Sequence, residues 1–391
     1  MRIKRVLLDK ILNSGGKEAI EAKVILDNGT YALASAPSAI MPGKREVIVS
    51  DYNKLDNMTI NNFLYDIYKI KNINQQKLDE YLEKNIEKVG SDITLSISLA
   101  FARASSISKK ISLVKYIEKL NKETSTESIP KPLVAIFSDG VHNAKQADRF
   151  QQIMISVNSN NFEKSVNTIL NIYNEVEKVI REKDNYVELG ASSGFITKNM
   201  TTDEQLKLLT DIIKKMNFDE FVTIALDVAA EHLKVNDKYK FENNLYTSEE
   251  FKKIIQRYIN KYNITFVEDP FDTEDKKNWI EFNKENKNII IVGDDLFATQ
   301  SQFINNKEAS GIIIKMNQVG TLYKTIETVK NARLNNFKLC VSHRSLETED
   351  TFICDLALAI NSEYIKIGGP RRGDRISKYN RLLKLTKKNK M

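Results

Sequence analysis

Four apolar runs in the second half of the chain each end in a charged residue. The runs are short and rich in isoleucine and valine, and they end at Asp227, Glu268, Asp294 and Lys315. Short β-branched runs separated by amphipathic stretches predict strands that alternate with helices. This alternation predicts a parallel (β/α) barrel, in which the C-terminal ends of the strands meet at one mouth. The sequence therefore predicts that three acids and a lysine converge on one site.

These residue types suit one kind of chemistry. Carboxylate oxygens are the hard ligands that Mg²⁺ prefers. We expect the pKa of a lysine near such an ion to be lowered, because the ion and burial both disfavour its ammonium form, so that Lys315 could serve as a general base. The pattern predicts removal of a proton next to a carboxylate. One acid at a strand end can be only the N-cap of the next helix, but four charged strand ends in succession favour a shared site.

The segments around these positions resemble the signature segments of the enolase family. They cover residues 267–271, 292–296, 314–321, 341–350, 364–370 and 371–375. The resemblance implies an α/β fold with a C-terminal (β/α)8-type enolase barrel over residues 126–391 and a smaller N-terminal α+β capping domain over residues 1–125. It also implies a glycolytic lyase that acts on 2-phosphoglycerate and phosphoenolpyruvate.

The resemblance assigns roles to the residues at the strand ends. Asp227, Glu268 and Asp294 look like the protein ligands of the tightly bound magnesium. Lys315 looks like the base that takes the C2 proton of 2-phosphoglycerate. His142 matches a family histidine in a loop, although the glycines around it are altered.

Five further residues would contact the substrate. By the resemblance, Lys366 binds the substrate carboxylate, and His343 belongs to the segment that closes over the substrate. Arg344 and Ser345 are placed for its phosphate, for which the planar fork of an arginine is well suited. Gln152 stands where the family has an active-site glutamate, and its amide keeps hydrogen bonding but cannot exchange a proton.

Two other departures from the family pattern bear on activity. Ser192 stands where the family has the general acid that protonates the departing hydroxyl, and loss of such an acid removes roughly 10²–10⁴-fold of rate. The neighbouring Glu188 is not expected to replace it, because it should point to the opposite face. Met41 stands where a serine joins a second magnesium, and a thioether is a poor ligand for a hard ion.

Three functions are therefore compatible with the sequence. The first is an enolase-like, Mg²⁺-dependent lyase with impaired dehydration. The second is proton abstraction in the same fold without elimination. The third is a non-catalytic enolase-like binding protein that has lost its acids, although such a protein would not need the complete barrel half of the site.

Composition limits the partners and the location of the protein. Its 391 residues, 41% of them hydrophobic, can bury the cores of two domains. The net charge of +7 comes from lysines spread among acids, so we expect no nucleic-acid partner. No apolar stretch is long enough to span a bilayer and charge interrupts the first residues, so we expect a cytoplasmic protein without membrane contact. The resemblance implies a homo-oligomer and a small phosphorylated carboxylate substrate.

Local signals place several elements. An Asn-Gly turn in residues 27–29 predicts a β-hairpin, and residues 122–132 are expected to link the domains. Thr247 and Glu250 have the spacing of a capping box. Thr321 could cap another helix. We expect His232 to lie on the helix after its strand and to face solvent or pack structurally.

Overall fold

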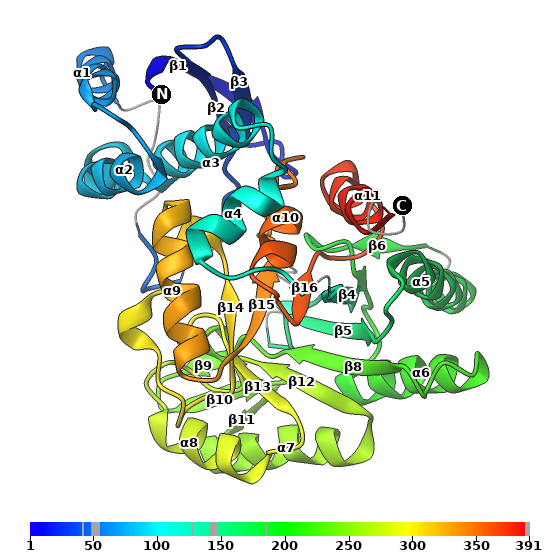
Figure 1. Cartoon of the computed structure of the whole chain (residues 1–391). Coiled ribbons are helices and arrows are strands. Elements are labelled where there is room, and N and C mark those ends of the chain that lie inside the picture. Colours follow the sequence, from blue (N-terminus) through cyan, green and yellow to red (C-terminus); the bar gives the residue numbers. More distant parts are fainter. Residues whose placement is uncertain (41–42, 48–54, 127, 141–147, 185, 388–391) are drawn as a thin grey trace.

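The structure is a computed structural model, and it describes residues 1–40, 43–47, 55–126, 128–140, 148–184 and 186–387. A smaller N-terminal part, in blue and cyan, lies beside one end of a barrel built from the rest of the chain (Figure 1). Among the described residues, no helix combines the length and the apolar character needed to cross a membrane.

The N-terminal part is an antiparallel sheet in the order β1-β2-β3 with helices packed on it. The predicted hairpin is confirmed, because Ile25 pairs with Tyr31 across the turn and Gly29 adopts a φ of +82°. Glycine adopts this conformation at little cost. The elements are β1 (Ile3–Leu12), β2 (Glu18–Leu26), β3 (Tyr31–Ser35), α1 (Asn57–Lys69), α2 (Gln75–Val89), α3 (Ser91–Ser108) and α4 (Leu113–Asn121).

Eight strands close the barrel in the order β4-β5-β8-β12-β13-β14-β15-β16, and β16 pairs with β4. Their bounds are β4 (Lys131–Phe137), β5 (Gln152–Val157), β8 (Val222–Asp227), β12 (Ile264–Glu268), β13 (Ile290–Gly293), β14 (Gly311–Ile314), β15 (Lys338–Ser342) and β16 (Tyr364–Lys366). Strand β4 starts at Lys131, one residue before the end of the expected linker.

One strand departs from the all-parallel barrel expected from sequence. Strand β5 is antiparallel to both β4 and β8, and the described residues between β4 and β5 contain no helix that could return the chain to the other end. The N-terminal end of β5 therefore lies among the C-terminal ends of its neighbours. As a result, Gln152 pairs with Asp227 at the mouth.

Helices surround the barrel, and their predicted caps are confirmed. Thr247 and Glu250 form a reciprocal capping box at α7, and Thr321 accepts the N–H of Lys324 at the start of α9. The helices are α5 (Phe162–Asp184), α6 (Thr202–Lys215), α7 (Ser248–Lys261), α8 (Lys276–Glu285), α9 (Leu322–Leu334), α10 (Phe352–Ala359) and α11 (Gly373–Lys387).

Minor elements complete the fold. They are β6 (Glu188–Leu189), β7 (Phe195–Ile196), β9 (Lys234–Val235), β10 (Lys238–Phe241), β11 (Asn244–Tyr246) and the 3-10 helices η4 (Ala230–Leu233), η5 (Ser301–Phe303) and η6 (Met316–Gln318).

Buried polar contacts fix the N-terminal part on the barrel. Helix α2 packs against α9, and the Asp79 carboxylate accepts the N–H of Tyr323 at 2.8 Å. Arg103 of α3 forms two hydrogen bonds of 2.6 and 2.7 Å with the Asp350 carboxylate. These contacts hold the N-terminal part close to the mouth.

Candidate active site

The strand ends bring the predicted acids to one side of the mouth. Glu268 at the end of β12 pairs in register with Asp227 at the end of β8, and Asp294 follows the next strand, β13. All three side chains are buried. The three predicted acids therefore lie at the C-terminal ends of three neighbouring strands.

Lys366 lies between two of these acids. Its ammonium donates to Asp227 Oδ2 and Glu268 Oε2, both at 2.7 Å, and its side chain is only 3% exposed. Burial by itself lowers the pKa of Lys366, but the two carboxylate charges and hydrogen bonds outweigh burial and raise it. Lys366 is therefore a firmly charged ammonium in this structure.

Lys315 forms an ion pair with the third predicted acid, Asp294. Its ammonium donates to Asp294 Oδ2, and Gln318 Nε2 donates to the other oxygen of Asp294 at 3.0 Å. Burial lowers the pKa of Lys315, yet the Asp294 charge raises it further, so that the net shift is upward. The lowered pKa expected from sequence refers to Lys315 beside a bound Mg²⁺, and it stays a prediction.

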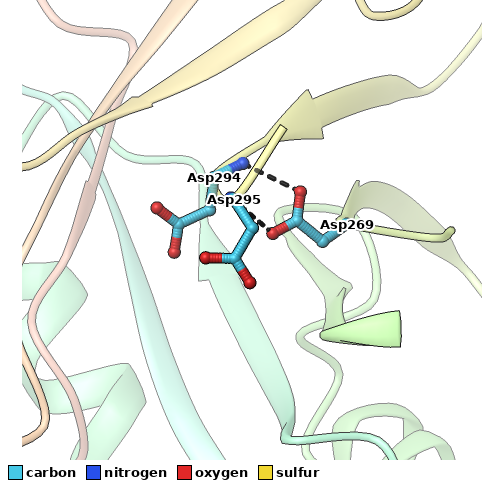
Figure 2. Close-up of side chains that lie close together, drawn as sticks. All are labelled: Asp269, Asp294 and Asp295. Carbon is cyan, nitrogen blue, oxygen red and sulfur yellow. Dashed lines mark hydrogen bonds between the residues drawn. The ribbon is translucent and has the colours of Figure 1, made fainter. Parts of the chain in front are cut away.

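A second acidic group lies beside the first. Oxygens of Asp269, Asp294 and Asp295 lie within 4.8 Å of one another, and the Asp269 carboxylate accepts the backbone N–H groups of both other residues at 2.9 Å (Figure 2). Burial and the Asp294 charge raise the pKa of Asp295 to about 7. Burial and neighbouring carboxylates also raise the pKa of Asp269.

The two acidic groups share Asp294 but differ otherwise. Among the described residues, the set that offers one oxygen each within 4.8 Å of the others is Asp269, Asp294 and Asp295, and it is not the predicted set. The predicted ligands Asp227 and Glu268 hold the Lys366 ammonium between them. Burial and the Asp227 charge raise the pKa of Glu268 to about 8. The ligand set Asp227, Glu268 and Asp294 stays a prediction.

The residues placed by resemblance at the phosphate are held by the N-terminal part. Arg344 forms a two-pronged ion pair with Glu46, at 3.0 and 2.9 Å, and both side chains are 4% exposed. Ser345 Oγ accepts the N–H of Ile40 at 2.9 Å. The cavity at the mouth measures about 60 Å³, far below the roughly 300–1,000 Å³ of most ligand sites.

The position of the missing acid is part of the same cavity. Ser192 lines it and is 1% exposed, and Gln152 lines it from the end of β5. Gln152 Nε2 donates to Asp227 at 3.3 Å, whereas its buried Oε1 has no hydrogen-bond partner among the described residues. Glu188 is exposed and forms an ion pair with Lys198, so it does not replace the acid, as expected.

An arginine side chain contacts one ring nitrogen of His343. The side chain of Arg375 contacts His343 Nδ1, and both residues are buried. Burial, followed by the Arg375 charge, lowers the pKa of His343 well below its usual value. His343 is therefore a neutral imidazole that lines the cavity.

Some site residues were not found from sequence, and others lie outside the described part of the chain. His232 was expected to face solvent or pack structurally, but it belongs to the short 3-10 helix η4 and lines the cavity. Glu46 and Gln318 were also missed, because no strand-end pattern marks them. Asp295 directly follows a predicted ligand, which was a usable signal. His142 and Met41 lie outside the described residues.

Fold and site together define a class: a two-part α/β-barrel protein whose mouth carries buried carboxylates, two lysines and an arginine. A family model described as the enolase C-terminal TIM barrel domain matches residues 126–389, and one described as the enolase N-terminal domain matches residues 3–117.

Full-length relatives agree with these models. The enolase of Ehrlichia canis is 33% identical, over 98% of this chain and 96% of the relative. The enolases of Elusimicrobium minutum and Metallosphaera sedula are each 32% identical, over 98% and 96% of this chain and 95% and 94% of theirs. The chain belongs to the enolase family of phosphopyruvate hydratase-like lyases.

Proposed function

We propose that the protein interconverts 2-phosphoglycerate and phosphoenolpyruvate. The observation that carries the proposal is the convergence of Lys315, Lys366 and the carboxylate of Asp294 at one barrel mouth. Lys315, as the neutral amine, would accept the C2 proton, and Lys366 would hold the substrate carboxylate, whose charge rises as the proton leaves. Arg344 and Ser345 would bind the phosphate.

The donor chemistry of the mouth fits Mg²⁺. Among the described residues, five carboxylates line the cavity and Glu268 lies beside it, whereas the lysine and arginine side chains that line it are Lys315, Arg344 and Lys366. Burial, followed by the charge of a neighbouring carboxylate, raises the pKa values of Glu268, Asp269 and Asp295, and a bound cation would offset that repulsion. We assign the ion to the predicted carboxylates, Asp227, Glu268 and Asp294. When bound, it would stabilise negative charge that develops on the substrate.

Two substitutions separate the possible ligand sets. If Asp227, Glu268 and Asp294 hold the ion, Asp227→Asn should weaken Mg²⁺ binding measured by isothermal titration calorimetry at least tenfold, whereas Asp295→Asn should change it little. The opposite result would assign the ion to the group of Asp269, Asp294 and Asp295. Asp294→Asn should weaken binding in both cases, and it serves as the positive control.

Ser192 supports a second candidate function. Elimination breaks the C3–O bond, and the departing hydroxide needs a proton that a serine does not readily give. With Ser192 and Gln152 at this end of the cavity, the proton would come from a water molecule that they hold, and dehydration would be slow. Exchange of the C2 proton without elimination needs only Lys315 and the positive charge around the carboxylate.

One assay separates these functions. Purified protein with Mg²⁺ and 2-phosphoglycerate in deuterated water should form phosphoenolpyruvate above a Lys315→Ala control, and Ser192→Glu should raise the rate. Incorporation of deuterium at C2 without formation of phosphoenolpyruvate would show that the protein catalyses proton exchange and not dehydration. Binding of phosphoenolpyruvate with neither reaction would refute catalysis and support a binding protein.

We further propose a cytoplasmic homo-oligomer that binds neither nucleic acid nor membranes. A groove of about 1,360 Å³ between the N-terminal sheet and α11 is lined by apolar and charged side chains, and the apolar Leu12, Tyr31 and Ile107 are more than half exposed. The charged lining includes both acids and bases, among them Glu349 and Lys384, which suits a second copy of the chain. A monomeric mass in light scattering at micromolar concentration would refute this proposal.

A further inference from the structure

Arg375 connects two segments that carry site residues, although no strand-end pattern marks it. It lies in the first turn of α11 and is fully buried. Its Nη1 contacts His343 Nδ1, and its Nη2 donates to the carbonyl oxygens of Ala191 and Ser345, both at 3.1 Å. Asp374 Oδ2 lies 3.0 Å from its Nε and compensates its charge. The guanidinium thus contacts His343, the carbonyl group of Ser345 and the carbonyl group of Ala191, which directly precedes Ser192.

The chemistry of arginine decides the tautomer of His343. A guanidinium has hydrogen-bond donors and no acceptor, so in its contact with Arg375 the Nδ1 of His343 must be the acceptor. The single hydrogen of a neutral imidazole is then on Nε2. The adjacent positive charge also disfavours a second proton. Arg375 therefore selects one of the three states that a histidine can take.

The free nitrogen of His343 is available to a ligand. His343 lines the cavity, and no described residue forms a hydrogen bond with its Nε2. Gly368 lies between this ring and the Ser192 segment, because a Cβ on Gly368 would be 3.1 Å from His343 Cε1 and 2.7 Å from the Ser192 carbonyl oxygen. The ring and Ser192 therefore border the same part of the cavity.

We propose that Arg375 is a positioning residue that holds His343 as the neutral Nε2–H tautomer, so that His343 donates a hydrogen bond to an anionic oxygen of the substrate beside Ser192. The substrate half rests on the proposed function, whereas the tautomer is a property of the free protein. A neutral donor stabilises negative charge on the substrate without competing with Lys315 for the proton. This arrangement assigns a role to a residue that touches no substrate.

The tautomer can be measured without any activity. The chain has three histidines, so ¹⁵N spectra of histidine-labelled protein contain few signals, and His343→Gln assigns the one of interest. We expect the hydrogen of His343 on Nε2 in the wild type. Arg375→Gln, whose amide can either donate to Nδ1 or accept from it, should produce a mixture of tautomers. Arg371→Gln is the control, because the Arg371 side chain pairs with Glu177 at the surface. An Nδ1–H tautomer in the wild type, or no change in Arg375→Gln, would overturn the role of Arg375.

Two substitutions of His343 test the donor without altering Arg375. The amide nitrogen of glutamine can take the place of Nε2, whereas asparagine reaches only the position of Nδ1. We expect His343→Asn to raise KM for 2-phosphoglycerate, or Kd for phosphoenolpyruvate, at least tenfold relative to His343→Gln, with a smaller change in kcat. Equal affinities in the two variants would refute the donor role. If the wild type bound neither ligand, the proposed function and the substrate half would both fail, and the spectra would still decide the role of Arg375.

Discussion

Replacing Lys366 by methionine would remove the cation that two buried carboxylates share. Lys366 contacts Asp227 and Glu268 at 2.7 Å each, and the exposed fractions of the three side chains are 3%, 2% and 1%. One ammonium cannot neutralise two carboxylates, which is why the pKa of Glu268 is raised to about 8 by burial and the Asp227 charge. The variant would leave both buried carboxylates without a cation.

The expected loss of stability depends on pH. Breaking a buried ion pair by removing one partner costs about 3–5 kcal/mol. A carboxylate that has lost its cation can avoid part of this cost by binding a proton. Binding that proton costs about 1.4 kcal/mol for each unit by which the pH exceeds the ordinary pKa of the carboxyl group. Protonation therefore costs roughly 4 kcal/mol at pH 7 and roughly 1.5 kcal/mol at pH 5. Because the folded variant binds the proton more tightly than the unfolded chain, its stability relative to the wild type should fall as pH rises.

Urea unfolding at pH 5 and pH 7, in the presence of a chelator, measures both values. Added Mg²⁺ should restore part of the stability of the variant, by about 2.7 kcal/mol at one hundred times Kd. Lys234→Met is the matched control, because Lys234 pairs with Asp272 at 2.8 Å but is 25% exposed, and its loss should cost no more than about 1 kcal/mol. A loss below about 1 kcal/mol in Lys366→Met at pH 7, or a loss equal at both pH values, would refute the reasoning.

Two further predictions concern the contacts between the N-terminal part and the barrel. Burial raises the pKa of Asp79 to about 7 despite its hydrogen bonds, so the folded state holds this proton more tightly than the unfolded chain does. Wild-type stability should therefore fall by about 4 kcal/mol as the pH rises from about 4 to 7. In urea unfolding of Asp79→Asn this fall should disappear, and an unchanged pH profile would contradict the prediction. Glu46→Gln removes the carboxylate charge that pairs with Arg344. Calorimetry should then show that inorganic phosphate binds the variant about fivefold more tightly than the wild type, a gain of about 1 kcal/mol. Weaker binding would instead show that Glu46 orients Arg344 for phosphate.

The features that sequence predicted correctly have local causes. The hairpin at residues 27–29, the capping box of Thr247 and the cap at Thr321 depend on residues within a few positions of one another, so the sequence contains all the required information. The convergence of Asp227, Glu268 and Lys315 depends only on the parallel strands that carry them. The reversal of β5 was missed because a short apolar run has no direction of its own.

The features that sequence missed depend on which side chains meet in three dimensions. Glu46 and Arg344 are 298 positions apart, and their ion pair exists only because the N-terminal part lies over the mouth. The contact between the Lys315 ammonium and Asp294, whose charge raises the pKa of Lys315, could not be read from spacing either. His232 was assigned to a helix surface, whereas its short 3-10 helix turns it towards the cavity.

The ion pairs at the mouth imply an order of events. The cations that would bind the substrate are already held by carboxylates of the chain: Lys315 by Asp294, Lys366 by Asp227 and Glu268, and Arg344 by Glu46. An anionic substrate alone would have to displace these carboxylates, which would leave them buried and unpaired at high cost. Mg²⁺ on the carboxylates would free both lysines, so each ligand should strengthen binding of the other by the same factor. We expect phosphoenolpyruvate to bind at least tenfold more weakly with a chelator than with saturating Mg²⁺, and equal affinities would contradict this coupling.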